Sequence, residues 1–170
     1  SASVSPNRSE MVAVSSEGAM LRVKTKDLAF TNFAKHPSGA MRHVHFPFGA
    51  TDHVLTCSED SSVTLWDLND YSARVVCSGR SMPTPKCAVG SADVIVAGYQ
   101  DASIRGYEMQ QGASLWQIPN AHKKGVTTLN LAKNMRFLVS GGEEGELRVW
   151  EVKTKEMIAH LKEHSQAVND

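Results

Sequence analysis

The side chains of this chain that could do chemistry gather in a few short stretches. His43 and His45 alternate along "MRHVHF", so they point to the same side of a strand, as two ligands of one metal ion would. No third ligand follows nearby, and polar side chains on the outer face of a strand are the simpler interpretation. We therefore expect no metal site at this pair.

A second group consists of acids and a cysteine. Glu143, Glu144 and Glu146 could suggest cation binding, but alternation along a strand sends neighbours to opposite sides and hairpin turns are commonly charged. Cys57 follows Thr56 on a strand that we expect to be buried, where a thiol is inert packing. The sequence holds no G-x-S-x-G, P-loop or dinucleotide fingerprint. We predict neither an enzyme nor a cofactor.

Composition limits the partners of these residues. The 170 residues include 18 basic and 18 acidic ones, so the formal net charge is zero and nothing favours a nucleic acid or an anionic membrane. With 41% hydrophobic residues the chain can bury a core, and since it shows no long apolar run we expect neither a membrane span nor a signal peptide. Three cysteines without metal-type spacing fit a reducing compartment, the cytoplasm.

Four acids mark an internal repeat that must position these side chains. Asp60 lies six residues before Trp66, and Glu144 lies six before Trp150, in stretches of the same layout. Asp101 stands six before Tyr107, and a fourth unit carries an acid at position 17. The acids are 43, 41 and 43 residues apart, close to the period of four-stranded propeller units.

Within each unit the hydrophobic pattern has the period of a strand. In "SVTLWDL", Val63 and Leu65 face one side while Thr64 and Trp66 face the other. The acidic turn before this run joins two strands of a hairpin, and the strand after it buries alternate residues. The pattern predicts an all-β chain of antiparallel hairpins.

These repeats resemble the WD-repeat β-propeller family, in which His, Ser or Thr, Asp and Trp form a hydrogen-bonded tetrad within a blade. The tetrads that the resemblance implies are His36, Thr56, Asp60 and Trp66, and a variant with Glu in the Asp position, His122, Ser140, Glu144 and Trp150. These side chains can form such a hydrogen-bond chain, because an indole N–H donates and a carboxylate accepts, while a hydroxyl and an imidazole can each donate and accept. The third unit has Ala97 and Tyr107 in place of the hydroxyl and the tryptophan, so we expect it to lack the network.

The repeat spacing predicts a partial propeller, with about three full four-stranded blades and parts of flanking ones. Residues 1–35 would hold an N-terminal segment and the last strands of a preceding blade, from about residue 11. Full blades would follow at 36–77, 78–118 (degenerate) and 119–163. His164 and Val168 repeat the spacing of His122 and Val126, so residues 164–170 would begin a further blade of a longer protein.

Several short stretches of the sequence are similar to the cilia- and flagella-associated protein 52 family. They include Phe46-Pro47-Phe48-Gly49, Ile104-Arg105 in the degenerate unit and Asn120-Ala121-His122. The resemblance implies a non-enzymatic microtubule inner protein of the ciliary or flagellar axoneme, in contact with tubulin and other inner proteins. The alternative is a cytosolic adaptor that recruits peptide, signalling or ubiquitin-ligase partners. Neither interpretation identifies the partner-binding residues.

Overall fold

The computed structural model describes residues 1–35, 39–79 and 81–169. These residues form strands, turns and loops without a helix, so the predicted all-β fold is confirmed. Consequently, none of them belongs to an apolar helix of the length that crosses a membrane.

Within the described residues, sixteen strands form four antiparallel sheets of four strands, each in chain order. The first sheet contains β1 (Ala2–Val4), β2 (Glu10–Val14), β3 (Ala19–Lys24) and β4 (Phe30–Lys35). The second contains β5 (Met41–His45), β6 (His53–Ser58), β7 (Val63–Asp67) and β8 (Ala73–Cys77). The third contains β9 (Pro85–Gly90), β10 (Val94–Tyr99), β11 (Ile104–Glu108) and β12 (Ser114–Ile118). The fourth contains β13 (Val126–Leu131), β14 (Phe137–Gly142), β15 (Leu147–Glu151) and β16 (Met157–Leu161).

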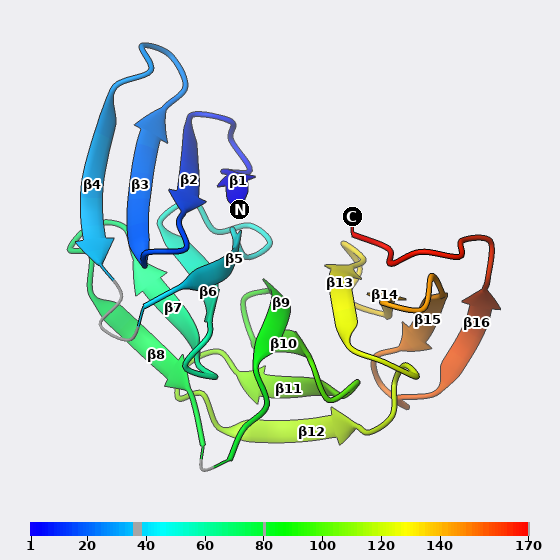
Figure 1. The fold of residues 1–170 in the computed structure, drawn as a ribbon. Helices are drawn as coiled ribbons and strands as arrows, with labels where there is room; N and C mark the ends of the chain where they lie inside the picture. Colours follow the sequence, from blue (N-terminus) through cyan, green and yellow to red (C-terminus); the bar gives the residue numbers. More distant parts are fainter. Residues whose placement is uncertain (36–38, 80, 170) are drawn as a thin grey trace.

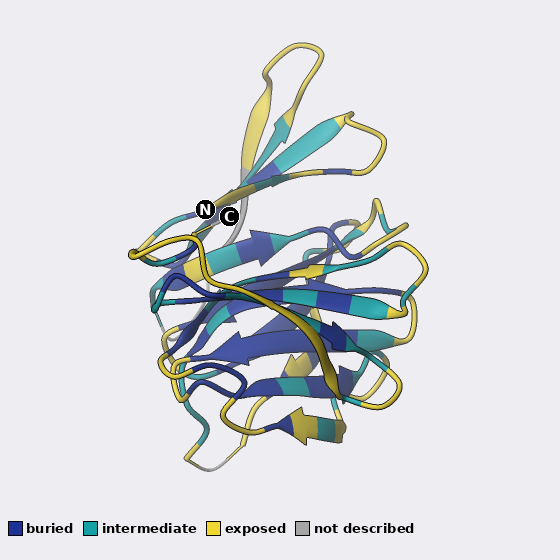
Figure 2. Ribbon diagram, turned by 90° about the vertical axis from the view of Figure 1, so that its right-hand side faces the viewer, coloured by how far each residue is buried: buried dark blue, intermediate teal, exposed yellow. Residues whose placement is uncertain are grey.

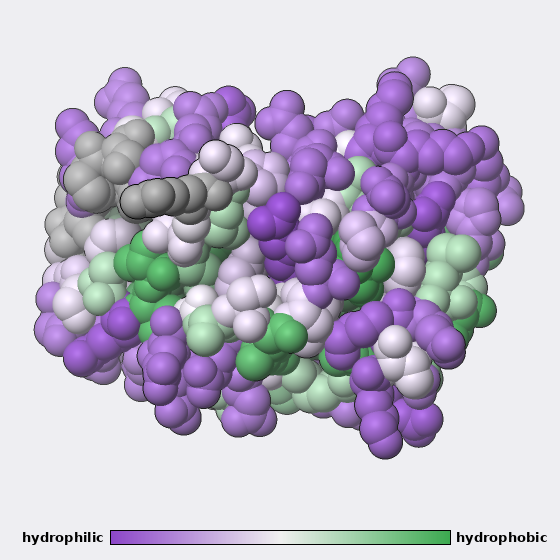
Figure 3. Space-filling view, turned by 90° about the horizontal axis from the view of Figure 1, so that it is seen from below, coloured by the Kyte–Doolittle hydropathy of each residue, from purple (hydrophilic) through white to green (hydrophobic). Residues whose placement is uncertain are grey.

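The four sheets follow one another around an arc (Figure 1). The first strand of each sheet, β1, β5, β9 or β13, lies nearest the centre, and the last, β4, β8, β12 or β16, lies on the outside. The marked chain ends both lie toward the centre, on the first and fourth sheets. Seen from below, the outer surface is mostly hydrophilic, with hydrophobic residues in separate patches (Figure 3).

The first sheet differs from the sequence prediction. Only the last strands of a blade, from about residue 11, were expected there, but β1 pairs with β2 and completes four strands, with Ser3 opposite Val12. A three-residue strand of small residues carries too little alternation to be recognised from sequence.

The turn between the second and third strands has the same geometry in all four sheets. The residue after each marker acid has a positive φ, as seen at Gly18 (79°), Ser61 (71°), Ala102 (66°) and Gly145 (82°). Its N–H donates to the carbonyl three residues earlier at 3.1–3.2 Å. Glycine adopts this conformation without steric cost, whereas serine and alanine need the surrounding hairpin to hold it. The constant turn explains why each acid keeps its distance from the following strand.

Among the residues that the structure describes, the hydrophobic core consists of three clusters, one between each pair of consecutive sheets. Val63 and Leu65 pack toward the third sheet while Trp66 packs toward the first, so the predicted alternation of this strand is confirmed. Burying a side chain of this size contributes roughly 1.5–3 kcal/mol. Figure 2 shows buried residues concentrated in the middle of the stack, with the first sheet at the top more exposed.

Glycines let consecutive sheets approach closely. A Cβ built on Gly98 of the third sheet would lie 2.5 Å from Val126 Cγ1 of the fourth. The same relationship recurs one unit later, where a Cβ on Gly141 would lie 2.9 Å from Val168 Cβ. Val168 is buried, and its N–H donates to Gly142 O at 3.2 Å. Val168 thus contacts the fourth sheet as Val126 contacts the third.

Candidate functional site

The fourth sheet contains a continuous hydrogen-bond chain through the four residues that the repeat singles out. Trp150 Nε1 donates to Ser140 Oγ at 2.8 Å, and Ser140 Oγ lies 2.8 Å from His122 Nε2. On the other side of the ring, His122 Nδ1 lies 2.8 Å from Glu144 Oε1. The longer glutamate therefore reaches the histidine, and the structure brings all four residues together.

Burial and hydrogen bonding determine the charges in this network. Burial lowers the pKa of His122, against the opposite effect of Glu144, so the imidazole is neutral at pH 7. A neutral ring fixes one direction for the chain, in which Ser140 Oγ donates to Nε2 and Nδ1 donates to Glu144. Burial would raise the pKa of Glu144, but N–H donors from its own backbone and from Lys123 outweigh it and leave that pKa lowered.

The second sheet contains the corresponding indole bond. Trp66 Nε1 donates to Thr56 Oγ1 at 3.0 Å, and both side chains are buried. Asp60 Oδ1 accepts from the N–H and the hydroxyl of Ser62, at 3.0 and 2.6 Å, which braces the turn. The predicted fourth member, His36, lies outside the described residues.

The third sheet replaces the network by a different buried contact. Tyr99 and Tyr107 share a hydrogen bond of 2.7 Å between their hydroxyls. The Arg105 guanidinium lies 4.9 Å from the centre of the Tyr99 ring and bonds to Asp101 Oδ2 at 3.0 Å. The absence of a tetrad in this unit agrees with the sequence prediction, whereas the tyrosine pair was not predicted. Its available signal was the coincidence of two tyrosines flanking the marker acid.

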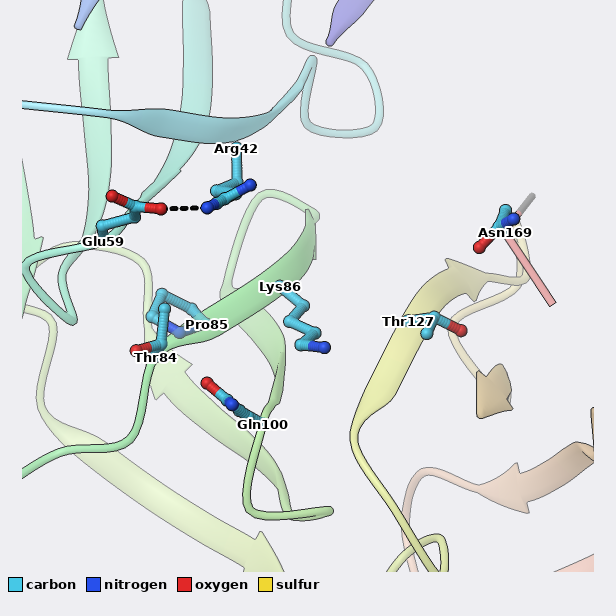
Figure 4. Close-up of a pocket in the computed structure, with 8 residues that line it drawn as sticks. All are labelled: Arg42, Glu59, Thr84, Pro85, Lys86, Gln100, Thr127 and Asn169. Carbon is cyan, nitrogen blue, oxygen red and sulfur yellow. Dashed lines mark hydrogen bonds and ion pairs between the residues drawn. The ribbon is translucent and has the colours of Figure 1, made fainter. Parts of the chain in front are cut away.

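A polar cavity of about 660 Å³ opens at the centre of the arc, beside the innermost strands (Figure 4). Its side chains come from equivalent positions. Arg42, Lys86 and Thr127 are the second residues of β5, β9 and β13, and Glu59 and Gln100 directly follow β6 and β10. Arg42 pairs with Glu59, and Lys86 pairs with Glu143 of the next sheet. The charges are thus mutually compensated, which suits a polar protein segment better than an ion.

The other chemical candidates are placed as follows. The rings of His43 and His45 stack with centroids 6.3 Å apart, and both side chains are half-buried, so the expectation that they lie on an exposed outer face was wrong. His43 Nδ1 accepts from Ala88 N–H of the neighbouring sheet at 3.3 Å. The described part of the chain contains no group of three or more His, Cys, Asp or Glu that could hold a metal. The expected exposed face was wrong because the side of β5 that carries His43 faces the neighbouring sheet.

The remaining candidates are buried or fully paired. Cys57 is fully buried, and burial raises its pKa well above the usual range, which disfavours the nucleophilic thiolate. Glu146 is 2% exposed, and its hydrogen bond from Arg148 lowers its pKa to about 2. His160 Nε2 and Lys162 Nζ lie 3.1 and 3.6 Å from the same carboxylate. The Glu146 carboxylate is therefore part of an ion-pair network with Arg148, His160 and Lys162.

Known families match the repeats that carry these networks. A family model described as WD domain, G-beta repeat matches residues 29–67. Another, described as anaphase-promoting complex subunit 4 WD40 domain, matches residues 90–169. Both models describe WD repeats, so the chain resembles WD-repeat proteins over these two ranges. Its four sheets are consistent with WD-repeat blades, and WD40 domains generally mediate protein–protein interaction.

Several longer proteins are similar to this chain in sequence. Cilia- and flagella-associated protein 52 of Homo sapiens is 28% identical over 161 residues, which is 90% of this chain and 25% of that protein. The Mus musculus protein of the same name is 28% identical over 159 residues, with the same coverage. Kinesin-like protein KIF21B of Mus musculus is 28% identical over 123 residues, 69% of this chain and 7% of that protein. The chain thus spans about a quarter of the cilia- and flagella-associated relatives.

Proposed function

We propose that this chain is part of a non-enzymatic scaffold of motile cilia or flagella, a microtubule inner protein that stabilises axonemal doublet microtubules. The observation that carries the proposal is its similarity, over 90% of its length, to cilia- and flagella-associated protein 52. Tubulin and other inner proteins are its proposed partners, and the axoneme its proposed location.

The physical character of the fold supports a passive mechanism. Consecutive blades share buried clusters, and the marker turns are braced by hydrogen bonds, so the arc resists deformation. A rigid body that displays loops on two faces can bridge neighbouring subunits, and modest contacts repeated along a lattice add by multivalency. The indole-to-hydroxyl bonds of Trp66 and Trp150 help to hold the blades in shape, and the loops make the contacts. No chemical step, cofactor, nucleic acid or membrane enters this mechanism.

One observation favours a second candidate, a cytosolic WD-repeat adaptor for peptide, signalling or ubiquitin-ligase partners. The family model that matches residues 90–169 is described by the name of a subunit of a multiprotein complex. An adaptor would use the same fold, and the polar central cavity would receive the partner. It differs from a doublet scaffold in where the protein is found.

Fractionation of cilia separates the two candidates. The full-length protein would be tagged in ciliated cells, and isolated cilia would be extracted first with detergent and then with high salt. A doublet scaffold remains with the stripped microtubules, where cross-linking should join it to tubulin. An adaptor leaves with the membrane and matrix fraction, and finding the protein there would refute the scaffold proposal.

A further inference from the structure

A second cavity, of about 380 Å³, lies between the second and third blades, away from the tetrads. Pro47 and Phe48, from the unusual Phe46-Pro47-Phe48-Gly49 stretch, form one wall. Met109 and Ser91 come from the third blade, and Leu65 lies 6% exposed beneath them. We call this cavity the FPFG pocket. Its volume is at the lower end of the ~300–1,000 Å³ of ligand pockets, which suits one or two bulky side chains.

The walls of the FPFG pocket are held in place without a ligand. Phe48 N–H donates to Gly90 O at 2.7 Å, which ties the β5–β6 loop to the end of β9. Ala50 N–H donates to Pro47 O at 3.0 Å within the loop. A Cβ on Gly90 would lie 3.2 Å from Met109 Cε and 3.4 Å from Pro47 Cβ, so the absent side chain lets both walls converge. The pocket is therefore preformed, which lowers the entropic cost of binding.

Phe48 is exposed despite this ordering. Its side chain remains 51% exposed although its backbone is bound to the next blade. A large aromatic side chain fixed beside an apolar pocket is the usual anchor of a protein contact, because it contributes much area for little lost freedom.

The charge around the pocket is acidic. We call the chain segments around its lining residues, 46–53, 90–93 and 108–113, the rim, and they contain Asp52, Asp93 and Glu108 and no Lys or Arg. Asp52 and Asp93 are exposed, and Asp52 Oδ1 lies 2.8 Å from His53 Nδ1. Arg74, on the same blade as Asp52, is held by two acids of its own, Asp67 and Asp70. A neutral chain therefore presents a locally negative rim around an apolar hollow.

We propose that the FPFG pocket binds a protein segment in which a bulky apolar side chain stands between basic residues. The apolar side chain would lie between Phe48 and Met109, and its Lys or Arg neighbours would face Asp52 and Asp93. Complementary charge makes the segment selective and accelerates its association, while the buried anchor provides affinity. The inference uses the proposed scaffold role only in taking the partner to be a protein.

The test is selection from a random peptide library against the purified full-length protein, followed by fluorescence anisotropy of the selected peptides. Peptides with an aromatic or aliphatic residue flanked by Lys or Arg should be enriched. Phe48→Ser should weaken their binding by about tenfold or more, as expected for an anchor contact. Asp93→Lys should weaken it and reduce its salt dependence.

Two matched controls locate the effect. Leu115→Ser removes a side chain of similar exposure, 54%, from the outer strand β12, and Glu163→Lys reverses an exposed charge outside the rim. Both should leave peptide binding unchanged. Enrichment of acidic peptides, no enrichment at all, or equal losses with Phe48→Ser and Leu115→Ser would overturn the proposal. Because peptide binding is measured in solution, its result is independent of where the protein is located in the cell. The axonemal location can be refuted while the FPFG pocket is confirmed, and the pocket can be refuted while the location is confirmed.

Discussion

Ser140 Oγ lies 2.8 Å from His122 Nε2 and accepts a hydrogen bond from Trp150 Nε1 at the same distance. Ser140 is fully buried, and both neighbours are nearly so. One hydroxyl thus connects the indole of β15 to the loop before β13 through β14. The Trp66–Thr56 bond occupies the equivalent place in the second blade, so the same tie between strands recurs in both tryptophan units.

Ser140→Ala should destabilise the chain by about 1–3 kcal/mol, because it leaves both the His122 ring nitrogen and the Trp150 N–H without a partner in a buried site. Urea unfolding followed by tryptophan fluorescence measures this loss. The matched control is Ser114→Ala on the exposed outer strand β12, which should change the free energy of unfolding by less than about 0.5 kcal/mol. Equal effects of the two substitutions would show that the hydrogen-bond network does not stabilise the folded chain.

Stability should fall on mild acidification. The unfolded chain binds a proton at His122 near the ordinary histidine pKa of about 6.5, whereas burial lowers that pKa in the folded chain. The unfolded state then binds more protons between the two values, so stability present at about pH 7.5 decreases toward about pH 5.5. His45, whose pKa burial also lowers, acts in the same direction.

The variant His122→Gln should flatten this pH dependence, measured as urea midpoints at several pH values. His164→Gln, at an exposed position, should retain it. Glu144 does not affect this measurement. Its pKa is lowered in the folded chain, so the stability that it contributes is lost only when the pH falls below about 4.5. An unchanged slope in His122→Gln would show that the imidazole is not kept neutral by folding.

The tyrosine pair of the third blade should behave as a unit. Tyr107→Phe or Tyr99→Phe alone leaves one buried hydroxyl without its partner and should cost about 1–3 kcal/mol. The double variant removes both polar groups and should cost less than the sum of the single ones. A double-mutant cycle by denaturant unfolding measures the coupling, and simple additivity would mean that the hydroxyls do not stabilise each other.

Gly98→Ala should destabilise the contact between the third and fourth blades by about 1–3 kcal/mol, because the new methyl group would overlap the Val126 side chain. Adding Val126→Ala removes the overlapped atoms, so the double variant should recover part of the loss beyond what Val126→Ala alone costs. Thermal unfolding of the four proteins in the cycle measures this. If no stability is recovered, the loss in Gly98→Ala does not come from overlap with Val126 but from a change within strand β10.

Much of the fold could be predicted because the repeat imposes it locally. Asp60 and Glu144 lie six residues before their tryptophans since the hairpin turn, with its fixed left-handed residue, sets that distance. The alternation of Val63 and Trp66 could be read directly, because neighbours on a strand face opposite blades.

Other features depend on contacts between blades that no local pattern encodes. His43 and His45 are half-buried because their side of β5 faces the neighbouring sheet, which alternation along one strand does not reveal. The FPFG pocket joins residues more than forty positions apart, and its close walls depend on Gly90. The short β1 carried too little pattern and is defined only by its pairing with β2.

Hydrogen exchange of the indole N–H groups, followed by NMR, tests most directly the central claim that the two tryptophan units are equivalent. Trp66 and Trp150 are 7% and 6% exposed and donate to buried hydroxyls, whereas Trp116 is half-buried on an outer strand. We predict that the indole protons of Trp66 and Trp150 exchange at similarly slow rates and that the indole proton of Trp116 exchanges much faster. Rapid exchange at Trp66 or Trp150, matching that of Trp116, would contradict the account.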